Sequence, residues 1–256
     1  MKRCGEEPAP RFSHARRRVH YQLMTIDPAV DPADIVGRLV DAIRSGDLPA
    51  LQRLIAQQPE VATARGPGGR TALHVATDWP GYFPDGPRIA ALLIDAGADP
   101  NARTAGPRAR ETPLHWTAST DDLDVADVLI DAGADIEAPD GSIGTPLENA
   151  IGYGCWHVAR RLVERGARVD KLWHAAALGL LGRLDEVAAT ATQDEIDEAF
   201  WQACHGGQLR AAQFLVARGA NVQVRPGYAD TSAIEVAAAP DTRRQQLVTW
   251  MATLGA

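Results

Sequence analysis

The feature of the sequence that most constrains the fold is a two-helix motif that returns along the chain. Its clearest copy is residues 111–138, ETPLHWTASTDDLDVADVLIDAGADIEA. Thr112 and Pro113 suit the cap and the first position of a helix, because the first turn leaves its N–H groups unpaired and proline has none to lose. A second apolar helix is expected to end at Gly133, a residue type that tolerates the left-handed conformation found there. Two such short helices cannot bury their own apolar faces, so the motif must stack on copies of itself.

Further copies of the motif stand in register with the first. From Thr112 to the equivalent Thr145 is 33 residues. The starts of the first helices share a Thr-x-Leu pattern: TALHVAT (71–77), TPLHWTA (112–118) and TPLENAI (145–151). The ends of the second helices share a Gly-Ala pattern: ALLIDAGADPNA (91–102), VLIDAGADIEA (128–138), RLVERGARVD (161–170) and FLVARGANVQV (214–224). Repetition in phase predicts a repeat protein rather than a single globular core.

These patterns resemble the T-P-L-H and L-L-x-x-G-A-D-V-N signatures of the ankyrin repeat. The resemblance implies an all-α fold, an ankyrin-repeat solenoid of about seven stacked helix-turn-helix units with short β-hairpin-like turns. We expect residues 1–32 to form a flexible, basic and proline-containing leader, and residues 33–256 to form the repeat array. The expected units lie near 34–66, 67–107, 108–140, 141–170, 171–193, 194–226 and 227–256. The fifth unit is short and lacks the Gly-Ala-Asp pattern, so we expect its helices to be joined without a full hairpin turn.

Composition narrows the class of protein. The formal net charge of −7 argues against a general nucleic-acid binder, which needs a basic face. Only two of the 26 basic residues are lysines, and this bias, together with abundant Ala, Gly and Pro, predicts a bacterial origin. Cys4, Cys155 and Cys204 are odd in number and do not suggest a disulfide framework, which indicates a reducing compartment. No apolar run approaches the roughly 18 residues of a membrane span and no secretory leader is expected, so the predicted location is cytoplasmic.

Two departures from the regular repeat support a binding hypothesis. The stretch DWPGYFPDGP (78–87) is an insertion between two helices, and it gathers three aromatic residues in a chain that is 5% aromatic. Insertions in repeat proteins map to loops on one face, often the binding face, and clustered aromatic residues are frequent interface anchors. The alternative is that these rings fold back over a neighbouring helix pair. The turn ARTAGPRARE (102–111) is also long, and its arginines either face an acidic partner or form a solvated loop.

The ankyrin resemblance implies a non-enzymatic protein–protein interaction module, which binds a partner protein through a concave groove and its hairpin and insert loops. We expect a monomeric chain and an unidentified protein partner, with no membrane partner and nucleic acid disfavoured. Aromatic and Arg side chains lose little conformational entropy for the area they bury, so they are expected to be the anchors. Matching residues to groove-facing positions gives the candidate partner-binding set: Arg70, Asp78, Trp79, Tyr82, Phe83, Arg108, Arg110, Glu111, Thr120, Tyr153, His205 and Tyr228.

No catalytic residue, metal site or cofactor is expected. His74 and His115 occupy the last position of the T-x-L-H pattern, where the resemblance implies an imidazole that bonds to turn backbone and to a neighbouring repeat. The remaining histidines and cysteines lack the spacing of a zinc site. Two rival hypotheses stay open. One is an enzyme whose site lies on the irregular fifth unit and residues 78–87, and the other is nucleic-acid binding through the basic stretch 11–20.

Overall fold

The described chain is built from pairs of short helices. A computed structural model describes residues 32–106, 110–239 and 245–254. These residues contain no β-strand, which confirms the prediction of an all-α fold made of helix-turn-helix units. Residues 1–31 of the expected leader lie outside the described residues. The chain divides into two compact units, which we call the N-terminal unit, up to Gly166, and the C-terminal unit, from Ala167 onward.

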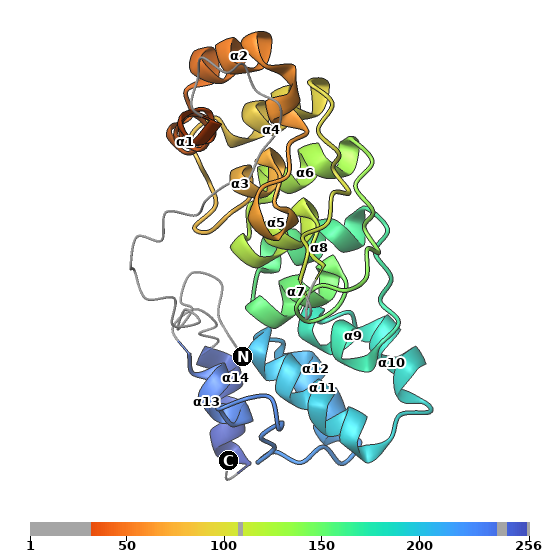
Figure 1. Cartoon of the computed structure of the whole chain (residues 1–256). Coiled ribbons are helices and arrows are strands. Elements are labelled where there is room, and N and C mark those ends of the chain that lie inside the picture. Colours follow the sequence, from red (N-terminus) through yellow and green to blue (C-terminus); the bar gives the residue numbers. More distant parts are fainter. Residues whose placement is uncertain (1–31, 107–109, 240–244, 255–256) are drawn as a thin grey trace. The chain divides into compact units, whose positions relative to one another are not determined.

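The N-terminal unit alternates first and second helices along its described residues (Figure 1). The first helices are α1 (Pro32–Ser45), α3 (Ala72–Ala76), α5 (Pro113–Thr120) and α7 (Pro146–Tyr153). The second helices are α2 (Leu48–Gln57), α4 (Gly86–Asp95), α6 (Leu123–Asp131) and α8 (Trp156–Glu164). Two 3-10 turns, η1 (Pro59–Ala62) and η2 (Pro67–Gly69), connect α2 to α3. First helices pack on first helices and second helices on second helices, so this unit has two helical layers.

Buried leucines at equivalent repeat positions form the core of the N-terminal unit. The first helices contribute Leu73, Leu114 and Leu147, each at most 1% exposed. The second helices contribute Leu93, Leu129 and Leu162, each fully buried. Truncating a buried leucine typically costs about 2–5 kcal/mol. The recurring leucines therefore hold each helix pair in a fixed register against the next pair.

The same type of cap begins many of the first helices. A Thr or Ser side chain accepts from the backbone of the third helical residue, whose side chain in turn accepts from the backbone of the cap. Such a box satisfies two N–H groups that the first turn leaves unpaired, and the cap contributes about 1 kcal/mol. The pairs are Thr71 with His74, Thr112 with His115, Thr145 with Glu148, Thr192 with Glu195, and Ser232 with Glu235.

The helices of the described C-terminal unit are α9 (Leu172–Leu178), α10 (Leu181–Ala188), α11 (Gln193–His205), α12 (Leu209–Val216), α13 (Ala233–Ala237) and α14 (Gln245–Thr253). The unit is organised around α11, which packs against α9, α12 and α13. Trp201 and Phe200 of this helix are fully buried. Only residues 189–192 join α10 to α11, which fits the expectation of a fifth unit without a hairpin turn.

The cysteines differ from the expectation. Cys204 is free and buried, but Cys155, which is also buried, is disulfide-bonded. The prediction that the cysteines are unpaired is therefore wrong for Cys155, and Cys4 lies outside the described residues. Because Cys155 is disulfide-bonded, the cysteines no longer support the prediction of a reducing compartment.

Candidate binding surface

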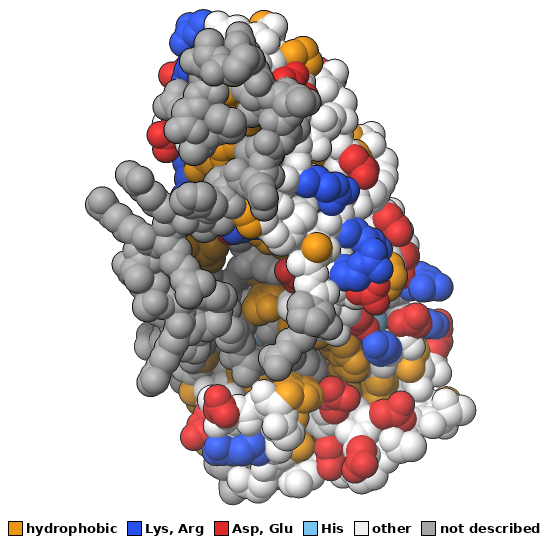
Figure 2. Space-filling model, viewed as in Figure 1, with side chains coloured by type: hydrophobic (Ala, Val, Ile, Leu, Met, Phe, Trp, Pro, Cys, Tyr) orange, Lys and Arg blue, Asp and Glu red, His pale blue; other side chains and the backbone are white. Residues whose placement is uncertain are grey.

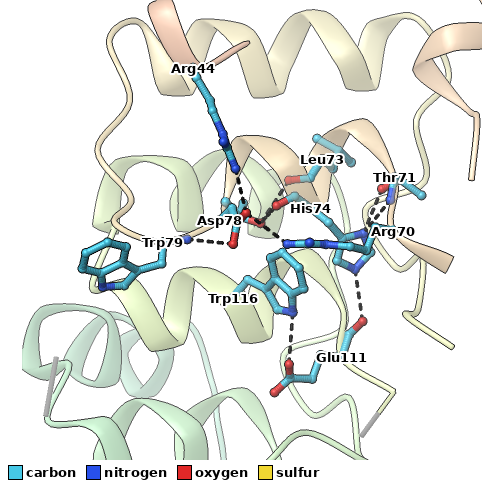
Figure 3. Close-up of polar contacts among 10 residues, drawn as sticks. Arg44, Arg70, Thr71, Leu73, His74, Asp78, Trp79, Glu111 and Trp116 are labelled. Carbon is cyan, nitrogen blue, oxygen red and sulfur yellow. Dashed lines mark hydrogen bonds and ion pairs between the residues drawn. The ribbon is translucent and has the colours of Figure 1, made fainter. Parts of the chain in front are cut away.

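The insert, residues 78–87, joins α3 to α4 and exposes two large aromatic side chains. Tyr82 is 60% and Trp79 is 59% exposed, more than any other large hydrophobic side chain among the described residues. In Figure 3 the Trp79 ring points away from the polar residues around Asp78. Phe83 is half-buried. The Trp79 ring therefore does not fold back over a neighbouring helix pair, which was the alternative that the sequence left open. Tyr82 touches the following repeat with its hydroxyl, but most of its surface stays exposed.

Tyr82 is anchored to the repeat that follows the insert. Its backbone N–H donates to Asp122 Oδ2 at 2.8 Å, and its hydroxyl donates to the carbonyl of Asp121. Burial raises the pKa of Asp122, while N–H bonds from Tyr82 and Val125 oppose that rise by favouring the carboxylate. The Tyr82 φ of 54° is in the left-handed region, which costs a non-glycine residue on the order of 1 kcal/mol. These hydrogen bonds offset that cost and fix the direction of the exposed ring.

Close packing holds the rest of the insert between two repeats. A Cβ on Gly81 would lie 2.8 Å from the Cβ of Thr120 in α5. A Cβ on Gly46, in the turn between α1 and α2, would lie 2.6 Å from the carbonyl oxygen of Pro84. Separations this short leave no room for a side chain at either glycine. Thr120 therefore supports the insert, and the insert is a fixed platform rather than a free loop.

Two arginines converge on one carboxylate beside the insert, and we call Arg44, Arg70 and Asp78 the arginine cluster (Figure 3). Arg44 Nη2 lies 3.1 Å and Arg70 Nη2 lies 3.0 Å from the same oxygen, Asp78 Oδ2. The other oxygen, Asp78 Oδ1, accepts from the Trp79 N–H at 3.0 Å. Because two guanidinium groups share one carboxylate, the cluster keeps one net positive charge. Asp78 thus positions the arginines and the start of the insert.

Trp116 of α5 connects the arginine cluster to the next repeat (Figure 3). The Arg70 guanidinium lies over its ring, 4.5 Å from the centroid, and the His74 ring meets it edge-on at 5.0 Å. The Trp116 indole N–H donates to Glu111 Oε2 at 3.1 Å. A cation–π contact at an exposed site contributes about 0.5–1 kcal/mol. Arg70 is therefore oriented by both Asp78 and Trp116 although its side chain is 43% exposed.

Glu111 joins this repeat to the one after it. Its Oε1 accepts from the Ser142 N–H at 3.0 Å and from Asn149 Nδ2 at 3.1 Å, while Oε2 accepts from Trp116. Asn149 is fully buried on α7. The carboxylate is thus engaged by three donors inside the protein. The prediction that Glu111 contacts a partner is replaced by a structural role.

His74 and His115 have the structural role that the resemblance implies. His74 Nδ1 accepts from the Thr71 N–H at 3.1 Å, so its proton is on Nε2, which donates to the Glu111 carbonyl at 3.1 Å. His115 makes the equivalent contacts one repeat later. Burial is the largest cause that lowers the pKa of both imidazoles, that of His74 from 6.5 to about 4. Both rings are neutral at neutral pH and each ties one turn to the next.

The long turn at 102–111 only partly fulfils its expected role. Arg103 Nη1 donates to the carbonyls of Arg110 at 3.1 Å and Pro139 at 2.7 Å. Arg65 Nη1 does the same one repeat earlier, donating to the Arg103 carbonyl at 2.9 Å. These two arginines bind consecutive turns together, so the idea that Arg103 faces an acidic partner is wrong.

Two further candidates of the N-terminal unit are accessible to different extents. Arg110 is exposed, and its side chain has no partner among the described residues. Tyr153 is half-buried, with its hydroxyl 2.9 Å from Ser142 Oγ. Arg108 lies outside the described residues. Arg110 consequently stays a candidate for direct contact, and Tyr153 presents only part of its side chain.

The two candidates in the C-terminal unit differ from each other. His205 is 2% exposed and its ring stacks on that of Trp201, with centroids 5.3 Å apart. The prediction that His205 contacts a partner is therefore wrong, because α11 is buried at the register position that the repeat pattern assigned to a groove. Tyr228 is 49% exposed and meets Trp201 edge-on at 6.0 Å. Both residues belong to the C-terminal unit, so neither is part of the candidate surface of the N-terminal unit.

Sequence reasoning missed Trp116 and Arg44. Aligning the repeats would have pointed to Trp116, because it follows His115 directly and shares its register position with Val75 and Asn149. Arg44 lies in the last turn of α1, where no motif marks it. Its importance comes only from its approach to Asp78, 34 residues further along the chain.

Comparisons with known proteins identify the repeat type. Residues 81–173 match the family model for ankyrin repeats (3 copies). Over 86 residues the chain is 38% identical to ankyrin repeat and SOCS box protein 16 of Homo sapiens, a match that covers 32% of this chain and 18% of that protein. Over 101 residues it is 31% identical to glycerophosphocholine phosphodiesterase gde1 of Schizosaccharomyces pombe, covering 40% of this chain and 8% of that protein. The chain thus spans only a small part of each relative.

A solved structure agrees with the fold. The crystal structure of the human ASB11 ankyrin repeat domain superposes with a TM-score of 0.53 at 22% identity, covering 83% of this chain and 96% of that one. The fold and the repeats at 81–173 confirm the ankyrin resemblance. The expected bacterial origin stays a prediction. Within the described residues, no helix is long and apolar enough to cross a membrane, and no group of three His, Cys, Asp or Glu side chains suits a metal ion.

Proposed function

Because the chain carries ankyrin repeats and has the fold of an ankyrin-repeat domain, we propose that it is a non-enzymatic module that binds a partner protein. The contact surface is the part of the N-terminal unit formed by the insert, the arginine cluster and Trp116. We call this the insert surface. It combines aromatic rings with guanidinium groups, the side-chain types that supply most of the binding energy at protein interfaces.

The observation that carries this proposal is the exposure of Trp79 and Tyr82 on a fixed loop. Ordering a flexible loop on binding costs roughly 0.5–1.5 kcal/mol for each immobilised side chain. The insert avoids much of that cost, because Tyr82 is hydrogen-bonded to the following repeat and Pro84 packs on the preceding one. Keeping two large aromatic rings exposed to water costs free energy, because their apolar surface is not buried. A partner that buries both rings would explain why the folded loop holds them there.

We propose a revised set of contact residues, based on the exposure and the contacts of each side chain. Direct contacts are assigned to Trp79, Tyr82, the exposed edge of Phe83, Arg70 and Arg110. Trp116 and Arg44 are added, since both belong to the same network. Asp78, Glu111 and Thr120 position these groups, and His205 is removed. Arg108 and Tyr153 stay proposals for the edge of this surface, and Tyr228 stays a separate proposed contact on the C-terminal unit.

A pair of alanine substitutions tests the proposed function. We expect both W79A and Y82A to keep the helical circular dichroism spectrum of the wild type, because both rings are exposed. W79A should also keep the melting temperature, whereas Y82A loses the hydroxyl bond to the Asp121 carbonyl, about 1 kcal/mol. Capture of a specific partner from a lysate of the native organism should fall by about tenfold or more for W79A alone, since interface hot spots typically cost at least about 2 kcal/mol. The double variant should lose capture completely.

A matched control removes an exposed apolar side chain elsewhere. Leu254 is 37% exposed beyond α14 in the C-terminal unit, so L254A should capture the partner as well as wild type. Unchanged capture by the double variant, with the control behaving as expected, would reject the insert surface as the binding site.

The enzymatic alternative on the fifth unit is less well supported by its own residues. A cavity of about 430 Å³ lies there, lined by acidic side chains and Trp173. One of these, Glu195, accepts from the Thr192 N–H at 2.8 Å and hydroxyl at 2.9 Å, and these bonds lower its pKa. A general acid needs a raised pKa. Glu195 therefore serves the cap of α11, and no second function is proposed.

A further inference from the structure

A small apolar cavity lies beside the arginine cluster, between α1 and α3 of the N-terminal unit. Its volume is about 60 Å³. Its apolar lining comes from the two helices and the segment that precedes α3, and it includes Val36, Leu39, Val40, Val61 and Val75. The same cavity is also lined by Arg44, Arg70 and Asp78. Among the described residues that line it, Asp78 is the only acidic one. The cavity therefore combines an apolar wall with a cationic rim.

The size of the cavity restricts what enters it. An engineered cavity of roughly 150 Å³ in another protein holds a benzene ring, so a space of about 60 Å³ is too small for an aromatic side chain. A branched aliphatic side chain such as leucine or valine can place its methyl groups there. Removing such a group from water favours binding, at about 25 cal/mol per Å² of apolar surface.

The rim selects for negative charge. Each guanidinium has five N–H donors, and Asp78 uses only part of that capacity on Arg44 and Arg70. Their side chains are 51% and 43% exposed, so the remaining donors are accessible. Asp78 and Trp116 hold the Arg70 guanidinium in place, which reduces the entropy lost when it binds a ligand. A carboxylate matches the fork geometry of arginine and would bond both arginines at once.

The net charge of −7 does not oppose this local preference. On the face shown in Figure 2, acidic and basic side chains are interspersed rather than separated into large areas of one sign. Exposed charges further apart than about 8 Å are largely screened at physiological ionic strength. The two arginines at the rim thus dominate the interaction with a charge placed directly on them.

We propose that the cavity between α1 and α3 binds a partner segment in which an aliphatic side chain is flanked by carboxylates. The aliphatic group fills the apolar wall and a neighbouring carboxylate bonds Arg44 and Arg70. The inference rests on the proposed function, because it assigns the partner chemistry at one end of the insert surface. Trp79 and Tyr82 would contact other parts of the same partner.

Synthetic peptides test this inference with the full chain. The probe is a short fluorescein-labelled peptide with a central leucine flanked by glutamates on both sides, and binding is measured by fluorescence anisotropy. Two matched peptides change one property each: glutamine replaces every glutamate, or serine replaces the leucine. We expect each change to weaken binding about tenfold or more, because each removes either the carboxylate contacts or the apolar group. In nuclear magnetic resonance spectra the glutamate–leucine peptide should shift the Trp116 indole N–H signal and leave that of the buried Trp201 unchanged.

Variants of the protein test the rim directly. R44Q and R70Q should each weaken binding of the glutamate–leucine peptide, and the double variant should bind it no better than wild type binds the glutamine peptide. The matched control is R88Q. Arg88 is also an exposed arginine paired with an aspartate, Asp85 at 3.1 Å, but it lies on α4 outside the cavity, so R88Q should bind as wild type does. Circular dichroism melting of each variant checks that the fold is kept.

The outcomes separate this inference from the proposed function. Equal binding of the glutamate and glutamine peptides, or no peptide binding at all, would overturn the cavity assignment. If W79A/Y82A still abolishes capture of the cellular partner in that case, the proposed function stands without this inference. If the peptide binds through Arg44 and Arg70 but W79A/Y82A captures normally, the cavity assignment stands and the insert is not the main anchor.

Discussion

Replacing Glu111 with alanine is expected to destabilise the N-terminal unit by about 2–4 kcal/mol. The carboxylate accepts from Trp116 Nε1, the Ser142 N–H and Asn149 Nδ2. Asn149 is fully buried, so its amide would lose its charged acceptor at a buried position. Ser142 is exposed, and water can satisfy its N–H. Equilibrium urea denaturation followed by circular dichroism measures the loss.

A graded substitution separates the hydrogen bonds from the side-chain volume. E111Q keeps one acceptor oxygen for Asn149 and Ser142 but turns an amide N–H toward the Trp116 indole N–H, so about 1 kcal/mol of destabilisation is expected. Asp95 is exposed at the end of α4, and D95A should stay within about 0.5 kcal/mol of wild type. If E111A is as stable as D95A, Glu111 does not join the two repeats as described.

Acidification from pH 7 to pH 4 is expected to destabilise the N-terminal unit through its buried histidines. The pKa of His74 is about 4 in the folded chain, against 6.5 for an unburied histidine, because burial disfavours the imidazolium. The stabilisation is fully present above pH 6.5 and is lost as the pH falls toward 4, since only the unfolded state then takes up the proton. At about 1.4 kcal/mol for each pKa unit, His74 alone contributes a loss of about 3 kcal/mol. His115 acts in the same direction.

The substitution H74Q isolates this effect. Glutamine does not titrate and can occupy the third position of a capping box, as the carboxylate of Glu148 does in α7. The groups that face His74, namely Arg65, Arg70 and Glu111, are unchanged in this variant. The difference in unfolding free energy between pH 7 and pH 4 should shrink by about 3 kcal/mol. A difference in H74Q equal to that of the wild-type chain would refute the assignment.

The fold was predictable because its signals are local and repeat. Thr112-Pro113 and Thr145-Pro146 mark the starts of α5 and α7, and both helices begin at the proline as expected. The short connection before α11 was also predictable, since the fifth unit lacks the Gly-Ala-Asp pattern. Each of these predictions depends on residues within one repeat, where the backbone preferences of Thr, Pro and Gly determine the structure.

The errors concern contacts between repeats. Glu111 was assigned to a partner, but its carboxylate binds groups 31 and 38 residues further along the chain. His205 was placed at an open position by register, and the neighbouring Trp201 ring together with burial of α11 removes it from the surface. A repeat pattern shows which positions are equivalent. It does not show which neighbour each side chain bonds to, because that depends on residues a whole repeat away.

Photo-crosslinking from the insert tests the central claim most directly. A photoreactive benzoylphenylalanine placed at Trp79 should form one discrete covalent adduct with a cellular protein on irradiation, because the ring at this position is proposed to be buried by the partner. The same amino acid at Arg160, an exposed position on α8, should give no such adduct. Identical products from both positions, or none from position 79 in an extract where the wild-type chain captures a partner, would contradict binding through the insert surface.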